Sequence, residues 1–370
     1  MKTSSLSLYA LRICVAVPTL VGCGGSSPPI GAPGAIPQSM AVSGNAGRSP
    51  EFSRLASRAK QILVWLPPSS SHFFAIGAFP ATGNGSLTPT TLISGDKPAL
   101  YGVFESTLFQ TPQGRVTPPG RLFTCSKDLK DHALHILAFA ARAHGDVAPV
   151  RNIGGSNNPL QTCRNVAADG VGRVAASAGP YNTIFLWSAA LNGNAKPSQT
   201  LAGDATKLDN PRGLGFNRAN DIYVVNDGYP FAYVTVYARD ASGNTPPLRE
   251  IDGYKTRIER PVAMAVSGDM IYVSNQGLGP PSETEPHITA YNVSQSGDVE
   301  PTILIEGPKT RLYHLMGGIG VDAAGYIYVN TFAAGRAHIL AFAPGATGDV
   351  APVQDIRSRK RFFDGQIALR

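Results

Sequence analysis

The hydrophobic positions of this chain fall into short runs of strand length instead of long helical stretches. One run, Ile-Tyr-Val, occurs at 222–224, 271–273 and 327–329, and weaker copies surround Val116 and Val174. A run of small apolar residues comes just before it, as in 213–217 and 318–322. Turn-forming residues such as "DAAG" separate the two runs. The pattern therefore predicts antiparallel hairpins.

A second pattern sets the repeat length. An aromatic residue is followed by Gly after five intervening positions, and then by Pro after three more. The copies are Phe79/Gly85/Pro89, Phe139/Gly145/Pro149, Trp187/Gly193/Pro197, Tyr237/Gly243/Pro247, Tyr291/Gly297/Pro301 and Phe342/Gly348/Pro352. Four antiparallel strands in a unit of roughly 50 residues are typical of a propeller blade. The sequence predicts an all-β fold, a six-bladed β-propeller of four-stranded antiparallel blades.

The two ends of the repeat predict how the ring closes. Residues 365–370, "GQIALR", match an innermost strand, whereas 61–67, 73–80 and 88–95 match the second to fourth strands. One C-terminal strand and three N-terminal strands would complete the sixth blade and leave no open edge. An open solenoid is the alternative, but it needs polar caps, and the C-terminal segment is not a cap.

These repeats resemble those of the NHL-repeat and gluconolactonase-like propellers, whose strands are similar to 318–330, "GIGVDAAGYIYVN". The resemblance covers roughly 62–370 and lies in the repeat consensus, so it implies the fold more than an activity. Gluconolactonase-like propellers hold a divalent metal in the channel with Glu, Asn and Asp. In this chain Glu105, Asn226, Asn275 and Asn330 stand at suitable heights, but no matching set aligns.

The N-terminus predicts export. Residues 1–22 combine Lys2 and Arg12 with a short apolar stretch that ends before Cys23. This resembles a bacterial lipoprotein signal, with Cys23 as the lipidated residue, and an ordinary secretory signal is the alternative. Residues 23–60 would form a Gly/Pro/Ser tether and a short helix, and the propeller would occupy 61–370. We expect a lipoprotein of the bacterial outer membrane, cell surface or periplasm, attached to the membrane only through its lipid.

Composition agrees with this organisation. Gly and Pro number 40 and 30, and only 15% of residues are charged, which disfavours a coiled coil. The formal net charge is +7, and much of the basic charge lies in the predicted blade-to-blade loops. Strand alternation places these loops on one face, together with the loops between second and third strands. The predicted basic rim comprises Lys207, Arg212, Lys255, Arg257, Lys309, Arg311, Arg357, Arg359 and Arg361.

This rim predicts an anionic partner, either a protein or an anionic glycan or envelope polymer. The alternative is a set of solvated side chains, partly paired with acids such as Glu259 and Asp209. Nucleic acid is not expected, because the chain is exported and the rim shows no interleaved aromatic residues.

Cysteines and histidines complete the candidates. Cys14 would leave with the signal, so Cys125 and Cys163 remain as a pair in an oxidising compartment, and a disulfide between them is expected. Two unpaired buried thiols are the alternative. His135, His287 and His338 each stand four residues before a repeat aromatic, in different blades. Such positions cannot converge on one metal, so they predict packing.

The sequence thus predicts a monomeric, non-catalytic binding scaffold at the cell envelope, without a cofactor. A metal-dependent lactonase or hydrolase of the gluconolactonase-like class is the alternative function, and only that alternative would need a divalent metal.

Overall fold

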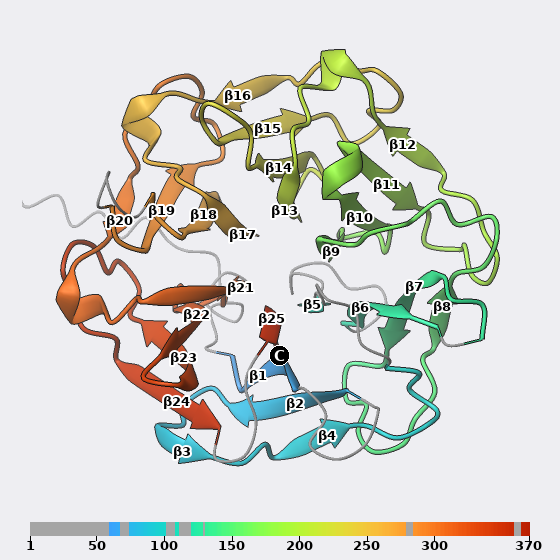
Figure 1. Ribbon diagram of the computed structural model, residues 1–370, viewed down its shortest axis with the longest axis horizontal. Coiled ribbons are helices and arrows are strands. Elements are labelled where there is room, and N and C mark those ends of the chain that lie inside the picture. Colours follow the sequence, from blue (N-terminus) through green and yellow to red (C-terminus); the bar gives the residue numbers. More distant parts are fainter. Residues whose placement is uncertain are drawn as a thin grey trace, which may run out of the picture. The chain divides into compact units, whose positions relative to one another are not determined.

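Six antiparallel sheets surround a common axis in the computed structural model of the protein (Figure 1). The structure describes residues 59–66, 74–100, 108–110, 120–128, 130–278, 284–358 and 364–370. The predicted signal, Cys23, the tether and nearly all of the predicted short helix lie outside these residues, as do Glu105, Arg359 and Arg361.

Each blade has four strands, which follow one another from the axis outward. Blade 1 has β25 (Asp364–Leu369), β1 (Gln61–Leu66), β2 (Ala75–Pro80) and β4 (Thr91–Ile93), and blade 2 has β5 (Leu108–Gln110), β6 (Leu122–Lys127), β7 (Leu134–Phe139) and β8 (Arg151–Ile153). Blade 3 has β9 (Asn165–Ala168), β10 (Val174–Ala178), β11 (Thr183–Trp187) and β12 (Gln199–Leu201), and blade 4 has β13 (Pro211–Phe216), β14 (Ile222–Asn226), β15 (Tyr233–Tyr237) and β16 (Arg249–Ile251). Blade 5 has β17 (Pro261–Ser267), β18 (Met270–Asn275), β19 (His287–Asn292) and β20 (Ile303–Ile305), and blade 6 has β21 (His314–Val321), β22 (Ile327–Ala333), β23 (Arg336–Phe342) and β24 (Gln354–Ser358), with β3 (Gly85–Leu87) added outside β24.

The only helices in the described residues are 3-10 turns. They are η1 (Gly179–Tyr181), η2 (Asp204–Thr206), η3 (Tyr254–Thr256) and η4 (Pro308–Thr310). The predicted all-β, six-bladed fold is confirmed.

Ring closure follows the predicted scheme. The C-terminal strand β25 pairs with β1 through Ile62 opposite Leu369 and Leu63 opposite Ala368, as the red and blue strands of Figure 1 show. Arg370 extends this pairing, because its N–H donates to the Gln61 carbonyl at 3.0 Å and its Nε donates to Gln61 Oε1 at 2.6 Å. Blade 1 is therefore built from both ends of the described propeller.

The core lies between neighbouring blades. All six repeat aromatics are 0% exposed. The one in blade 4, Tyr237, belongs to a hydrophobic cluster that includes Ala167 and Leu186 of blade 3. The innermost strands approach closely: a Cβ placed on Gly213 would lie 2.7 Å from Met264 Cβ. The small residues of the innermost strands are thus required by the narrow space near the axis.

The repeat glycine fastens each blade to the one before it. Gly243 forms a parallel bridge with Leu201 of the preceding outer strand, and its N–H donates to the Thr200 carbonyl at 2.6 Å. Its φ is +67°, which favours glycine. The next side chain, Asn244, accepts the Ala205 N–H at 2.8 Å.

We call this arrangement the blade clasp. Gly145, Gly193, Gly297 and Gly348 make the same bridge to the preceding blade, and Gly85 makes it within the β3–β24 pairing. Asp146, Asn194, Asp298 and Asp349 accept the equivalent backbone N–H. Five complete clasps, together with the pairing of Gly85 with β24, account for the regular glycine spacing of the sequence.

Alanine substitutions within one clasp should differ in cost. At Gly243 a Cβ meets no atom within 4 Å, so Gly243→Ala should lower the free energy of unfolding by about 1 kcal/mol through backbone strain alone. Gly203 has φ +111°, and its Cβ would lie 2.5 Å from Asn244 Oδ1, so Gly203→Ala should cost at least about twice as much. Urea unfolding of both variants measures the difference, and equal costs would contradict this account of the clasp.

Candidate binding face

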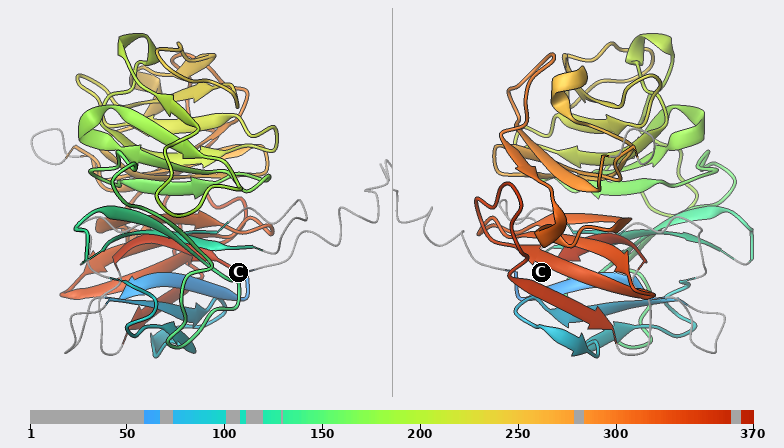
Figure 2. Two further views of the ribbon diagram at one scale, coloured as in Figure 1. Left: turned by 90° about the vertical axis from the view of Figure 1, so that its right-hand side faces the viewer. Right: turned by 60° about the vertical axis from the view of Figure 1, so that its left-hand side comes forward.

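Strand alternation gives the propeller two faces, which Figure 2 presents edge-on. One carries the loops between second and third strands and the links between blades, and we call it the loop face. It includes η1, the β14–β15 loop, the described ends of the β18–β19 loop, and the links that contain η2, η3 and η4. The other, which we call the hairpin face, carries the loops between first and second and between third and fourth strands.

Exposed aromatic side chains gather on the loop face. Tyr229 is 94% exposed and Tyr254 is 78% exposed, whereas 12 of the described aromatic residues are buried. The exposed large apolar residues of the described loop face are Tyr181, Tyr229, Phe231, Tyr254, Leu278 and Tyr313. Those of the hairpin face are Val150, Val171, Leu248 and Val353. Every described aromatic of this exposed set therefore lies on one face.

Two of these residues, Phe231 of the β14–β15 loop and Tyr254 of the link to blade 5, are in contact, and Tyr229 precedes Phe231 by two positions. The rings of Phe231 and Tyr254 meet edge to face with centroids 4.4 Å apart. The backbone N–H of Tyr229 donates to Asp209 Oδ2 at 3.4 Å, which ties the β14–β15 loop to the preceding link. We call Tyr229, Phe231 and Tyr254 the aromatic cluster.

A half-buried tyrosine stands two positions beyond Phe231. The hydroxyl of Tyr233 donates to the Lys207 carbonyl at 2.8 Å. Burial, followed by the nearby carboxylates of Asp209, Glu250 and Asp252, raises the pKa of Tyr233 to about 12, so the hydroxyl remains a donor at neutral pH.

The aromatic cluster was not predicted from the sequence, where the basic rim was taken to lack interleaved aromatic residues. That prediction is wrong: Tyr254 is adjacent to Lys255, and Tyr313 follows Arg311 by two positions. These tyrosines stand in the sequence between the predicted strands, next to the basic residues of the links. Five tyrosines and five phenylalanines are buried in the described residues. The type of an aromatic residue therefore does not predict whether its side chain is buried or exposed.

The structure places the described rim residues in ion pairs. Lys207 reaches Glu250 at 2.7 Å, Arg257 reaches Glu306 at 2.7 Å, and Arg311 reaches Asp355 at 2.7 Å. In each case, a link residue contacts the outer strand of the following blade or the residue just after it. The remaining pairs are Arg212–Asp227, Arg257–Glu259, Lys309–Asp349 and Arg357–Asp355.

Two consequences follow for the rim. Lys207, Arg257 and Arg311 each pair with an acid on or just after an outer strand, so these side chains lie toward the outer edge of the ring and not at a channel mouth. Within the described part of the rim, Lys255 alone has a side-chain cation with no carboxylate within 4 Å, although its backbone N–H donates to Asp298 at 2.7 Å. The positive charge open to an anion is therefore smaller than the sequence count indicates.

The asparagines that stood at suitable heights for a channel metal serve the backbone instead. Asn226 Oδ1 accepts the Asp209 N–H at 3.2 Å, and Asn275 Oδ1 accepts the Glu259 N–H at 3.1 Å. Asn330 Oδ1 accepts the Gly318 N–H at 2.7 Å. All three side chains are 0% exposed, so they fix strands and links and are not presented to a ligand.

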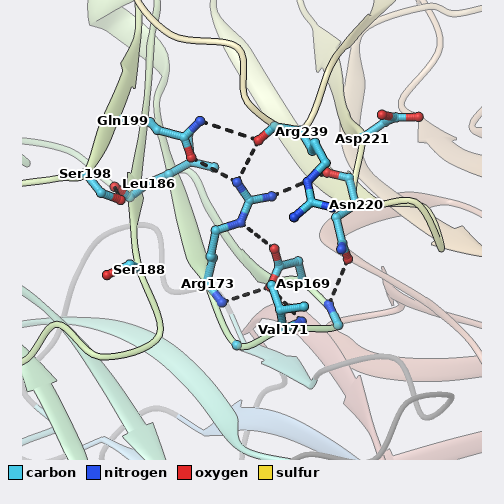
Figure 3. Close-up of polar contacts among 12 residues, drawn as sticks. Asp169, Val171, Arg173, Leu186, Ser188, Ser198, Gln199, Asn220, Asp221 and Arg239 are labelled. Atoms are coloured by element: carbon cyan, nitrogen blue, oxygen red, sulfur yellow. Dashed lines mark hydrogen bonds and ion pairs between the residues drawn. The ribbon is translucent and has the colours of Figure 1, made fainter.

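Acidic side chains at the hairpin starts are also structural. Asp169 Oδ2 accepts from Arg173 Nε at 2.5 Å, and Arg173 continues to Gln199 and to the Arg239 carbonyl, as Figure 3 shows. Asp322 holds its own turn through the Tyr326 N–H at 2.9 Å. The Arg173 network joins the hairpin faces of blades 3 and 4.

The expected disulfide is present. Cys125 of β6 bonds to Cys163 in the link before β9, with their Cα atoms 6.4 Å apart. It connects a strand of blade 2 to the segment that enters blade 3, on the loop face.

The three equivalent histidines lie in separate blades, as predicted. His287 contacts the Glu285 and Arg257 carbonyls through its two nitrogens, each at 2.8 Å. His338 Nδ1 contacts Asp355 Oδ1 at 2.7 Å, and His135 Nδ1 contacts Asn152 Oδ1 at 2.7 Å. All three are less than 9% exposed.

Comparisons with known proteins support the fold. No family model matches the chain, and no curated protein matches it in sequence. Among solved structures, a Bacteroides caccae protein of unknown function is 10% identical, covers 84% of this chain and 99% of its own, and superposes with a TM-score of 0.50. At that identity the similarity shows a shared fold alone.

Two further structures give lower scores. A Bacteroides uniformis protein with a proposed 6-phosphogluconolactonase activity is 16% identical, covers 81% of this chain and 83% of its own, and has a TM-score of 0.48. The WD40 domain of Toxoplasma gondii coronin is 12% identical, covers 82% and 70%, and has a TM-score of 0.47. In the described residues, no helix has the length and apolarity to cross a membrane.

Removal of the disulfide should destabilise the propeller. The bond spans 38 residues, and a closed loop of that length is worth about 4 kcal/mol in the chain-entropy model. The Cys125→Ala/Cys163→Ala variant should therefore melt at a lower temperature than the oxidised protein. Calorimetry checks this, and an unchanged melting temperature would contradict it.

Asp355 should make stability depend on acid. Burial raises the pKa of Asp355, but hydrogen bonds from His338 and Arg311 lower it by more, so the net shift is downward. The contribution is thus complete above the unfolded-state pKa, near 3.8, and is lost as pH falls through the lower folded-state pKa. Asp355→Asn should reduce stability at pH 7 and flatten its decline below about pH 4, as measured by thermal melts across pH.

Proposed function

We propose that this protein is a non-catalytic binding scaffold of the cell envelope that captures a partner protein on its loop face. The aromatic cluster is the observation that carries the proposal. Aromatic side chains, with arginine, supply most of the affinity at protein interfaces. A tyrosine that is 94% exposed contributes little to the fold, so its place on a rigid face is better explained by contact with a partner.

The scaffold also presents these side chains with little freedom to lose. The blade clasp and the Asp209 contact fix the links on either side of the cluster, and Phe231 and Tyr254 already touch. A face that is ordered before binding gives up less entropy when a partner docks.

The charge of the partner is a second determinant. Most described rim cations are paired with acids, so we propose that the aromatic cluster supplies most of the affinity for the partner. We assign recognition of an anionic group on the partner to Lys255. An anionic glycan or envelope polymer would use the same charge with fewer aromatic contacts, so substitutions in the cluster and at Lys255 separate the two kinds of partner.

No particular feature of the described residues supports the alternative function, a metal-dependent lactonase. The three asparagines of the inner hairpins are occupied by backbone hydrogen bonds. The envelope location rests on the sequence alone, with Cys23 as the lipidated residue of an exported chain.

Alanine at the aromatic cluster should weaken partner capture. Tyr229→Ala and Tyr254→Ala should each reduce the amount of partner crosslinked in native envelopes by about tenfold, because both remove exposed contact area. Leu248→Ala, on the hairpin face, is the matched control and should leave capture unchanged. The measurement is quantitative mass spectrometry after crosslinking, and equal capture by all three variants would contradict the proposal.

Charge reversal should distinguish the faces. Lys255→Glu should weaken capture at low salt, and the difference should shrink as salt rises. Lys196→Glu makes the same change on the exposed hairpin face and should have no effect. If Lys255→Glu abolishes capture while the alanine variants retain it, the partner is an anionic polymer and not a protein docked on the aromatic cluster.

A further inference from the structure

The β6–β7 loop brings together the ligands for a metal ion. Asp128, Asp131 and His135 each offer one ligand atom, and these atoms all lie within 4.8 Å of one another. Two carboxylates and one imidazole are a donor set that suits divalent transition metals. The loop lies on the loop face, three residues beyond the disulfide residue Cys125.

The two nitrogens of His135 both face oxygen atoms. Nδ1 lies 2.7 Å from Asn152 Oδ1, and Nε2 lies 2.9 Å from Asp131 Oδ2. A neutral imidazole has one N–H and can donate to only one of them. The Asp131 carboxylate can only accept, so Nε2–H donates to it when no metal is bound, and a metal bound at this position would replace that proton.

The equivalent histidine of blade 6 has a carboxylate as the partner of Nδ1. His338 Nδ1 lies 2.7 Å from Asp355 Oδ1, and each histidine precedes its partner by 17 residues. A carboxylate only accepts, so Nδ1 of His338 is the donor. In blade 2 the partner of Nδ1 is the Asn152 amide, which can donate or accept, so Nε2–H of His135 is the group that donates to Asp131.

A metal-binding histidine is also held by a polar partner on one of its ring nitrogens. Such residues donate one ring N–H to an oxygen and ligate the metal through the other nitrogen. His135 is 8% exposed and is held in place by Asn152, so its Nε2 is positioned by the fold. Blade 6 offers the contrast, because no described acid lies beside Nε2 of His338.

The two carboxylates are also oriented. Asp128 Oδ1 accepts the Lys130 N–H at 2.7 Å, and Asp131 Oδ1 accepts the Ala133 N–H at 2.9 Å. Asp128 keeps its second oxygen for a ligand, and Asp131 Oδ2 faces His135 Nε2 at 2.9 Å. The Ala133 N–H and then His135 lower the pKa of Asp131, which keeps this carboxylate ionised at neutral pH.

We propose that Asp128, Asp131 and His135 bind one divalent transition-metal ion, with Zn²⁺ as the best match to the donor set. Three protein ligands leave a coordination position for water or for an atom of a bound partner. Mg²⁺ is a poor match, since it favours oxygen ligands in an octahedral shell. This site is separate from the aromatic cluster and does not depend on the proposed function.

The test is zinc titration of the EDTA-treated, oxidised protein by calorimetry. One Zn²⁺ should bind per chain, and millimolar Mg²⁺ should not displace it. Asp131→Asn and Asp128→Asn retain the oxygen that accepts the loop N–H, so both should fold, and each should weaken Zn²⁺ binding by at least about tenfold. His135→Gln should abolish binding, whereas His144→Gln, which removes an exposed histidine of the hairpin face, should leave it unchanged.

Two outcomes would overturn the proposal. One is the absence of stoichiometric Zn²⁺ binding by the wild-type protein, in which case a proton occupies the position between His135 and Asp131 and the pair is an ordinary ion pair. The other is equal Zn²⁺ affinity in wild type, Asp128→Asn and Asp131→Asn, which would place the ion elsewhere. Histidine ring NMR separates these cases, because Zn²⁺ at this site should shift the His135 Nε2 resonance and leave that of His338 unmoved.

Discussion

The propeller depends on the contact between one blade and the next. Five of its outer strands, β4, β8, β12, β16 and β20, have only three residues each, too few to hold a sheet edge by themselves. The clasp gives the end of each such strand a second neighbour, the glycine of the following blade. Because the same contact fixes the link into that blade, it also positions the loop face.

The architecture was accessible from the sequence because its causes are local and repeated. The aromatic, glycine and proline of each repeat recur at fixed spacing. The aromatic fills the space between blades, the glycine adopts a positive φ, and the proline stands in a turn. The closure by 364–369 could be predicted for the same reason, since a lone inner-strand pattern at one end matches three outer patterns at the other. The disulfide followed from the number of cysteines and the face on which their loops lie.

The binding face was less accessible, because exposure and pairing are not local properties. Tyr237 and Tyr254 differ little as residue types, yet one is 0% and the other 78% exposed. The basic residues of the links suggested a converging rim, but three of them pair with acids more than 40 residues away on or just after outer strands, as Lys207 does with Glu250. Asp128 and Asp131 were close to His135 in sequence, but the orientation of the His135 ring depends on Asn152, which the fold brings in from β8.

The pairing of β25 with β1 has a consequence for how the ring forms. Ile62 and Leu369 stand at opposite ends of the described chain, so their contact has nearly the largest sequence separation that the propeller contains. Contacts of this kind form late, because the intervening chain must first be ordered. Blade 1 therefore lacks its innermost strand until the other blades are in place. Before β25 pairs with β1, the inner edge of β1 and the apolar side chains of blade 1 would be exposed to solvent. Addition of β25 would therefore be the step that completes the ring.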